Sequence, residues 1–536
     1  MNTNLVAAMQ NIMGYFCQSV YHGDYDSCIK LFADNFHVEC NLPDEKLFLR
    51  GKSEIAEHFK KRRKILCDKG ISREILIYNT PDFRTENTEG KGIWNVFVFR
   101  CGEKTDGKYK NVEPSFARID CDFVEQNGHI RISRMDWYQL MNWMDWKYAK
   151  RGKTIVEPLE GTMMEGFECN NLLNLITQID AEDFVQLEQL ISRFSHTNRL
   201  GAEKLFAEDK DTRLYLSGCM EKVVRGYEAV CSEFHRLEKL EKNNDNNPIC
   251  IPYVTAPILC VSKDRQYAEG SFLVMSFQVK GKAFGYSLQK PEVVRSIGLL
   301  KTKFVKQKEQ WKIKSYIYDE KYIFAPVHRH LNGCKWKPAV EATGNEKHAE
   351  DIFEIQGLML EWTERLKTGR LKEYPDLFMS SAKDEITEWL SYDPKRKCVG
   401  YDAVMKDLNR MDYNYAIKNL YKAAIVHCAM TPLIEISLDG TYAYGQWLDL
   451  CHTDLSQITG DYKIPVPTMM NACKYQHVYR KENGHWKLLH FTWGAFLAMD
   501  HIYADPTTWK GWVTYKNIPW PMPFERYILC ENKDKK

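Results

Sequence analysis

The sequence has no excess of charge of either sign. Its 74 Lys and Arg side chains nearly balance 72 Asp and Glu side chains, which leaves a formal net charge of +2 over 536 residues. Without a basic field to attract phosphates, we expect no nucleic-acid partner. No stretch approaches the roughly 18 consecutive apolar residues of a membrane span, and the N-terminus lacks a basic region followed by an apolar run. We therefore expect neither a membrane span nor a secretory signal peptide.

Several motifs that carry chemistry are also missing. The sequence contains no Gly-rich phosphate loop and no Gly-x-Ser-x-Gly elbow, which argues against the nucleotide-dependent and hydrolase classes that need them. Its 17 cysteines are an odd number, scattered, and form no Cys-x-x-Cys. This pattern predicts free thiols in a reducing interior, so we expect a cytoplasmic protein. His328, His330 and Cys334 offer only three irregularly spaced ligands, and we predict no metal and no cofactor.

What the sequence does contain is a long internal repeat. The segment Thr431–Gly445 repeats Ala256–Gly270 at a constant offset of 175 residues, with Pro, Ser, Asp, Tyr, Ala and Gly in register. A glycine that opens an apolar-periodic stretch recurs three times, at Gly51, Gly226 and Gly400. A period of this size is that of a whole domain, far beyond the roughly 20–50 residues of solenoid repeats. We therefore predict one fold unit written three times.

Each predicted unit is long enough to bury its own core. The linkers fall where the apolar periodicity lapses, near residues 150–160 and 332–346. Three prolines between Pro519 and Pro523 exclude a helix, so an extended arm is expected at the C-terminus. The predicted domains are residues 1–152, 158–332 and 345–516, with the arm at residues 517–536.

Within a unit, the pattern predicts helices first and strands afterwards. Apolar residues keep helical spacing over Ile352–Leu366, and a second helical pattern follows each glycine landmark. In the first unit that second helix carries the basic run Lys60–Lys64, which indicates a solvated face. The remainder is rich in aromatic and β-branched residues, as in Phe97–Phe99, and Asn483-Gly484 is a strong hairpin signal. This order is typical of an α+β fold.

These elements carry further landmarks, such as Leu31-Phe32 at the end of the first helix and the closing Gly-x-Trp-Lys strand at Gly484–Lys487. Together they resemble the SnoaL-like branch of the nuclear transport factor 2-like superfamily, over nearly the whole chain. The resemblance implies three tandem cone-shaped domains, each a curved antiparallel sheet wrapped around N-terminal helices, with an apolar pocket inside. Members include polyketide cyclases, ketosteroid isomerases, scytalone dehydratase and non-catalytic modules, so the fold alone does not choose a function.

The third unit resembles the scytalone dehydratase type of this superfamily. It has Glu361-Trp362 on its first helix and Trp493 on its last strand. His427 and His452 match the two pocket histidines that this type carries on neighbouring strands, where the resemblance makes them acid and base. One neutral imidazole would take a proton α to a carbonyl and the other would protonate the departing hydroxyl, since a pKa near neutrality lets histidine do both.

The third unit also departs from this type. Leu366 and Lys367 stand where the family carries a tyrosine and an aspartate on the first helix, while Cys473 and Tyr475 replace a serine and an asparagine. The orienting acid and the carbonyl donors are therefore missing or supplied by other residues. The candidates for substrate binding are Trp362, Trp447, Asp449, Tyr475 and Gln476.

The first unit carries a hint of a ketosteroid isomerase strand. Asp120 resembles an aspartic acid that an apolar cavity keeps neutral, so that it can donate a hydrogen bond to an oxyanion. Cys40 stands at the position of that family's base, and Tyr21 stands at the first-helix position of the missing acid. The alternative is that Asp120 is a solvated strand residue on the same face as Asp122.

The second unit offers no comparable pair. Tyr253 lies near the position of His427, and Phe277 stands at the position of His452. We therefore expect this unit to serve as scaffold.

Two functional hypotheses follow. The first is a cofactor-free lyase or isomerase of the dehydratase type, acting in the third domain on a hydrophobic cyclic carbonyl compound of polyketide-like or steroid-like character. The second is a non-catalytic protein that binds a small hydrophobic ligand or acts as a scaffold. The three units could form a pseudo-trimer within one chain. Alternatively, two of them pair with each other and the third pairs with a second copy of the chain, which makes a homodimer. The sequence leaves both arrangements open.

Overall fold

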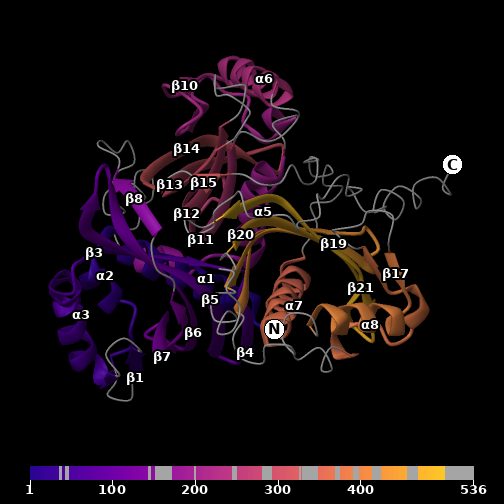
Figure 1. Cartoon of the computed structure of the whole chain (residues 1–536), viewed down its shortest axis with the longest axis horizontal. Coiled ribbons are helices and arrows are strands. Elements are labelled where there is room, and N and C mark those ends of the chain that lie inside the picture. Colours follow the sequence, from indigo (N-terminus) through magenta and orange to yellow (C-terminus); the bar gives the residue numbers. More distant parts are fainter. Residues whose placement is uncertain are drawn as a thin grey trace, which may run out of the picture.

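The computed structural model contains three lobes that follow one another along the chain, with three long helices between them (Figure 1). The predicted C-terminal arm and most of both predicted linkers lie outside the described residues. The structure describes residues 1–34, 39–42, 47–142, 146–150, 172–197, 201–243, 250–280, 292–324, 327–328, 348–368, 375–389, 397–412, 424–454 and 469–500.

The first segment begins with helices and ends with long strands. The side chain of Asn2 accepts a hydrogen bond from the backbone of Leu5 and caps α1, and Gly23 ends this helix in the left-handed conformation. The elements are α1 (Thr3–His22), α2 (Tyr25–Ile29), β1 (Glu39–Leu42), β2 (Leu47–Arg50), α3 (Gly51–Asp68), β3 (Ile71–Tyr78), β4 (Asp82–Glu86), β5 (Glu89–Asp106), β6 (Tyr109–Gln126), β7 (His129–Asn142) and β8 (Trp146–Lys150).

The second segment repeats this order. Asp180 caps α5 by accepting hydrogen bonds from the backbone of Glu182 and Asp183. The elements are α4 (Leu172–Thr177), α5 (Ala181–His196), the 3₁₀ helix η1 (Ala202–Leu205), β9 (Arg213–Leu216), β10 (Val224–Arg225), α6 (Tyr227–Asn243), β11 (Cys250–Val261), β12 (Tyr267–Lys280), β13 (Glu292–Gln307), β14 (Gln310–Phe324) and β15 (Val327–His328).

The third segment has the same order again. The predicted hairpin at Asn483-Gly484 is confirmed, because both residues have positive φ between two paired strands. The elements are α7 (Ala349–Thr368), the 3₁₀ helix η4 (Lys383–Glu385), β16 (Thr387–Trp389), β17 (Lys397–Val399), α8 (Tyr401–Asp412), β18 (Ala424–Ile436), β19 (Tyr442–Asp454), β20 (Met469–Glu482) and β21 (His485–Asp500).

Strand pairing also recurs from segment to segment. A short early strand pairs in parallel with the last long strand in each, as β1 with β7, β9 with β14 and β16 with β21. The long strands of the second and third segments share one register at the offset of 175 residues. Val254 pairs with Val274, for example, as Ala429 pairs with Asp449.

The strands form two hydrogen-bonded sheets. The third segment makes a six-stranded sheet in the order β17-β16-β21-β20-β19-β18. The first two segments share a fifteen-stranded sheet, because β8 pairs with β6 of its own segment and with β14 of the next. The predicted α+β composition is confirmed, but the first two segments are joined by backbone hydrogen bonds that the sequence did not indicate.

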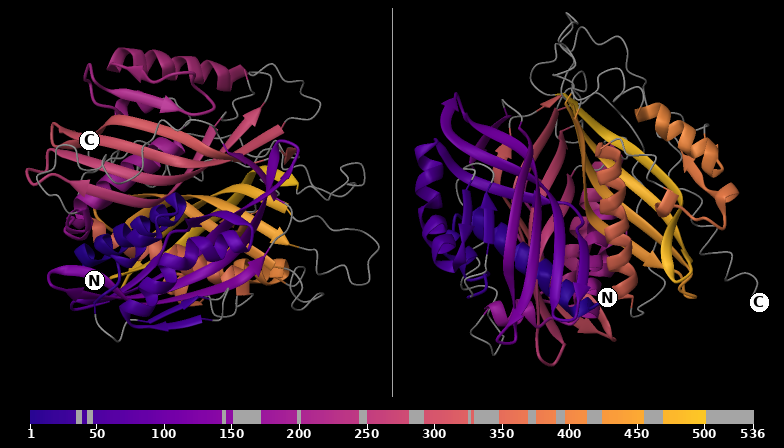
Figure 2. Two further views of the ribbon diagram at one scale, coloured as in Figure 1. Left: turned by 90° about the vertical axis from the view of Figure 1, so that its left-hand side faces the viewer. Right: turned by 90° about the horizontal axis from the view of Figure 1, so that it is seen from below.

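The long helices lie between the segments, and each packs against strands of another segment (Figure 2). Helix α1 packs against β11, α5 against β18 and α7 against β4. Gly14 lets α1 approach closely, since a Cβ at this position would lie 1.9 Å from the backbone oxygen of Pro257. The helices therefore connect first segment to second, second to third and third to first.

Three threonine hydroxyls join the same three pairs of segments. Thr80 donates to the backbone oxygen of Ala429 at 3.1 Å and Thr431 to that of Val254 at 3.2 Å. Thr255 donates to the backbone oxygen of Tyr78 at 2.6 Å. All three threonines are buried, and buried carbonyls that lose their donor destabilise a fold. These contacts tie the centre of the molecule together.

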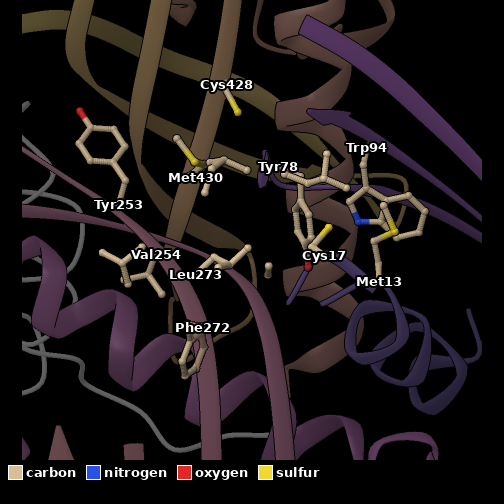
Figure 3. Packing of buried hydrophobic residues seen from close by; sticks show 14 of the residues in the cluster. Met13, Cys17, Tyr78, Trp94, Tyr253, Val254, Phe272, Leu273, Cys428 and Met430 are labelled. Carbon is tan, nitrogen blue, oxygen red and sulfur yellow. The ribbon is translucent and has the colours of Figure 1, made fainter. Parts of the chain in front are cut away.

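One hydrophobic cluster of buried residues runs through all three segments. Figure 3 shows Met13 and Tyr78 of the first segment beside Leu273 of the second and Met430 of the third. A polar group interrupts this core where the long helices meet. Gln10 donates to Gln356 at 3.2 Å, and Gln356 donates to the carboxylate of Glu188 at 3.0 Å.

The prediction of a solvated basic face on the second helix of the first segment is wrong at one position. Arg62 is 2% exposed and lies 2.9 Å from the carboxylate of Glu74, which also contacts Arg100 at 3.1 Å. The pKa of Glu74 is lowered, because the two guanidinium groups outweigh the effect of burial. Among the described residues, no helix has the length and apolar character needed to cross a membrane.

Candidate functional site

The candidate site lies on one face of the six-stranded sheet. His427 on β18 pairs directly with Cys451 on β19, and Asp449 precedes Cys451 by two positions on that strand. Tyr475 on β20 pairs with Trp493 on β21. Because side chains alternate along a strand, this register brings all five side chains to the same face.

His427 and Asp449 form a hydrogen-bonded pair. Nδ1 of His427 lies 2.8 Å from Oδ2 of Asp449. A carboxylate can only accept, so Nδ1 carries the proton and Nε2 remains for chemistry. Asp449 is fully buried and His427 is 8% exposed. Burial alone would lower the pKa of His427, but Cys451 and the Asp449 carboxylate raise it well above its ordinary value.

Two aromatic residues complete this arrangement. The Tyr475 hydroxyl lies 3.2 Å from Nδ1 of His427, and burial together with Asp449 raises the pKa of Tyr475 well above its ordinary value. Tyr475 therefore keeps its proton. The indole of Trp493 donates to Oδ2 of Asp449 at 3.2 Å. Asp449 is thus an acidic side chain that contacts His427 from a strand, not from the first helix.

A second histidine of this face was not among the predicted site residues. The ring of His477 lies 5.5 Å from that of Tyr475 and 5.6 Å from that of Trp362 on α7. Its Nδ1 lies 2.8 Å from the hydroxyl of Tyr479. Burial lowers the pKa of His477 to about 3, so this imidazole is neutral. The alternation Tyr475, His477, Tyr479 on one strand is the sequence signal that indicates the shared face.

Some buried polar atoms of this interior have no hydrogen-bond partner among the described residues. They are Oδ1 of Asp449, Nε2 of His477 and Nε1 of Trp447. All three residues are fully buried, and the Trp447 ring lies 5.5 Å from that of His477. Buried polar atoms are normally paired with protein or water, so these atoms mark where a polar group would be stabilised.

Two of the predicted residues stand at positions on the other face of the sheet from His427. Gln476 lies on the opposite face, where its side-chain amide donates to Tyr444 and Gln446. Position 452 pairs with Val426, one step out of phase with the pair of His427 and Cys451. The alternation of the strand places positions 427 and 452 on opposite faces of the sheet. The side chain of His452 is outside the described residues, and its role remains a prediction.

The first segment does not support a neutral Asp120. Arg118 binds this carboxylate with Nε 2.6 Å from Oδ1 and Nη2 2.9 Å from Oδ2. Both side chains are partly exposed on the face that also carries Asp122. The contact with Arg118 and the partial exposure agree with the alternative of a solvated strand residue, and the role of Asp120 as an oxyanion donor stays a prediction.

The other two candidates of the first segment lie elsewhere. Tyr21 is buried on α1 with its ring 5.9 Å from that of Tyr322 in the second segment. Cys40 lies on β1, paired with Leu49 and Met135, and its side chain is outside the described residues. No contact joins Tyr21 to Asp120 in the part of the chain that the structure describes.

Tyr253 of the second segment contacts the backbone of the strands that carry the candidate site. Its hydroxyl donates to the backbone oxygens of Asp449 at 3.4 Å and Cys473 at 3.5 Å. Figure 3 shows Tyr253 beside the strand that carries Cys428 and Met430. The second segment therefore supports the strands of the site.

Three further residues of the third segment have ligand atoms close enough to hold a metal ion. They are Glu388 on β16, Cys398 on β17 and Asp407 on α8, whose ligand atoms all lie within 4.8 Å of one another. The strands β16 and β17 that carry two of these residues form one edge of the six-stranded sheet, and β18, which carries His427, forms the opposite edge. It does not include any residue of the His427 cluster.

Residues 347–492 match a family model described as a SnoaL-like domain. A SnoaL-like domain therefore occupies the third segment. The match covers less than half of the chain, and it includes His427, Asp449 and Tyr475. No curated protein matches the chain.

Solved structures similar to parts of the chain share little sequence with it. A proposed scytalone dehydratase from Novosphingobium aromaticivorans has 12% identity and a TM-score of 0.23, covering 30% of this chain and 97% of its own. A hexachlorocyclohexane dehydrochlorinase has 10% identity and a TM-score of 0.23, covering 29% and 94%. An NTF2-like protein with a cystatin-like fold, also from Novosphingobium aromaticivorans, has 14% identity and a TM-score of 0.22, covering 25% and 82%.

Proposed function

We propose that the SnoaL-like domain carries out acid–base chemistry of the dehydratase or isomerase type on a small hydrophobic carbonyl compound. The observation that carries the proposal is the buried pair of His427 and Asp449, with the Tyr475 hydroxyl beside it. An imidazole oriented by a buried carboxylate is the standard arrangement for moving a proton at a defined atom.

The raised pKa of His427 decides the direction of the first step. At neutral pH the imidazole is protonated, so Nε2–H is a general acid that can protonate a departing hydroxyl or a carbonyl oxygen. Asp449 stabilises this imidazolium and fixes its ring. After the transfer, the neutral Nε2 can accept the proton α to the carbonyl. The protonated Tyr475 is a hydrogen-bond donor for developing negative charge on oxygen.

A domain organisation belongs to the same proposal. We infer three SnoaL-like units at residues 1–152, 158–332 and 345–516, arranged as a pseudo-trimer within one chain. The recurring parallel pairs, the common register and the cyclic threonine bonds support it. In this arrangement the first two units support the third.

The alternative function is a non-catalytic binding or scaffolding protein. One observation favours it. The ring centroids of Trp362, Trp447 and Phe491 lie 5.5 to 6.2 Å from that of His477. Trp362 and Phe491 are also 4.7 Å apart. Aromatic side chains therefore already fill part of the interior.

The deciding experiment offers cyclic β-hydroxy ketones to the full-length protein and follows the absorbance of the enone product. We expect His427→Gln and Asp449→Asn to lower kcat/KM by about 10²–10⁴, the usual contribution of a general acid or base. His485→Gln is the matched control, because His485 is exposed in the same domain. Binding of these ketones without turnover, unchanged in both site variants, would instead support the scaffold.

A further inference from the structure

The candidate site contains a thiol in contact with the second ring nitrogen of its histidine. Sγ of Cys451 lies 3.9 Å from Nε2 of His427, on the side of the ring opposite to Asp449. The contact follows from the strand register, since the two residues are directly opposed on β18 and β19. A thiol, an imidazole and a carboxylate in this order are the arrangement that activates a sulfur nucleophile.

The surroundings of Cys451 select the kind of molecule that can reach it. Cys451 is 3% exposed and packs with Cys473 and Trp493, so an electrophile that reaches this thiol has to be small and largely apolar. The Tyr475 hydroxyl beside His427 is a donor for a carbonyl oxygen. A buried carboxylate oxygen, Oδ1 of Asp449, has no partner among the described residues and lies within the same group.

The neighbouring Cys428 provides a comparison within the same strand. It follows His427 in sequence, so it occupies the other face of β18. Burial raises the pKa of Cys428 well above its ordinary value, which keeps this thiol protonated and unreactive. Burial alone therefore does not activate a cysteine of β18 or β19.

We propose that Cys451 is a covalent modification site for small α,β-unsaturated carbonyl compounds. The proton that His427 carries at Nε2 is the one that the Cys451 thiol gives up, and the resulting sulfur anion adds to the β-carbon of the enone. The π electron pair of the carbon–carbon bond moves to the α-carbon, which then takes the proton back from the imidazolium. The product is a thioether in which the thiol hydrogen has moved to carbon, so the step needs no oxidant or other reactant.

The inference goes beyond the proposed function, because it needs only the thiol beside the pair of His427 and Asp449 and no turnover. It also has a chemical connection to that function. Loss of water from a β-hydroxy ketone creates an α,β-unsaturated carbonyl compound, which is the class of electrophile that this thiol would take.

The test treats the full-length native protein with cyclohex-2-enone and maps adducts by peptide mass spectrometry over time. We expect one adduct at Cys451, none at Cys428, and a rate at Cys451 that falls about tenfold or more in His427→Gln. His485→Gln should label at the wild-type rate. Labelling at exposed Cys67 supplies a reference for reagent activity.

Two results would overturn the proposal. One is a Cys451 that reacts only after denaturation, and the other is an equal rate in wild type and His427→Gln. If His427→Gln does not fold, the pH dependence of the wild type decides. Below its pKa an ordinary thiol such as glutathione gains about tenfold in rate per pH unit. A rate at Cys451 that changes by less than about threefold between pH 6 and pH 8 supports transfer to the histidine, and a glutathione-like slope refutes it.

Discussion

We predict that Glu188 makes the stability of the protein depend on pH. This carboxyl group is buried in the core where α1, α5 and α7 meet, and it accepts a hydrogen bond from the side-chain amide of Gln356 at 3.0 Å. Burial raises the pKa of Glu188 from 4.5 to about 7. The folded protein therefore holds this proton more tightly than the unfolded chain does.

The sign and size of the effect follow from linkage. A raised pKa in the folded state means that the stabilising form is the protonated one, fully present below the unfolded pKa near 4.5 and lost as the pH rises through about 7. A difference of about 2.5 pKa units corresponds to about 3 kcal/mol. Between pH 5 and pH 8, wild type should lose about 2–3 kcal/mol that a permanently neutral side chain would keep.

Glu188→Gln is the perturbation that isolates this term, because glutamine preserves the shape and the hydrogen bond to Gln356. The measurement is urea unfolding followed by tryptophan fluorescence at pH 5 and pH 8. We expect the variant to exceed wild type in stability by about 2–3 kcal/mol more at pH 8 than at pH 5. Glu57→Gln, at an exposed carboxylate, should show no such difference. A difference for Glu188→Gln that stays flat with pH would refute the argument.

Three further substitutions test the contacts of the interior, each by urea unfolding at pH 7. Arg62→Met should destabilise the protein by about 3–5 kcal/mol, because it removes one partner of the buried Glu74 carboxylate. Adding Glu74→Leu should recover part of that loss. A loss of stability below about 1 kcal/mol, as for an exposed ion pair, would contradict the buried pair. Gly14→Ala should destabilise the protein by about 1–3 kcal/mol, because the added methyl group overpacks against the backbone of Pro257. Alanine is the better helix former, so a stabilised variant would contradict the close contact between α1 and Pro257. Thr255→Val keeps the shape and should cost about 1–3 kcal/mol by removing a donor from a buried carbonyl, whereas Thr441→Val, at an exposed turn, should cost less.

The parts of the fold that were predictable depend on short-range patterns. The turn at Asn483-Gly484 and the helices after each glycine landmark are local features, and the structure has them where the sequence indicates. Arg62 was not predictable in the same way. Nothing in a basic run shows which of its side chains faces a carboxylate on a strand, and that pairing is a property of the tertiary fold.

The candidate site was predictable to the same extent. His427, Asp449 and Tyr475 were all named from the sequence, but their mutual positions depend on strand register, which alternates faces at every residue. The residue paired with His427 on β19 is Cys451. His452 is the next residue along β19, so its position lies on the other face of the sheet. His477 was missed for a related reason, since only the alternation along β20 indicates that it shares a face with Tyr475.

A comparison within the molecule bears on whether the His427–Asp449 pair serves the fold. At the offset of 175 residues, the second segment has Pro252 and Val274 at the corresponding positions, in the same register of paired strands. Val274 is fully buried there, so this backbone folds around an apolar side chain where the third segment buries a carboxylate. Burying a charged group costs free energy unless partners compensate for it. The carboxylate beside His427 is therefore a feature that this backbone does not require for folding, and it is one that the proposed acid–base chemistry would need.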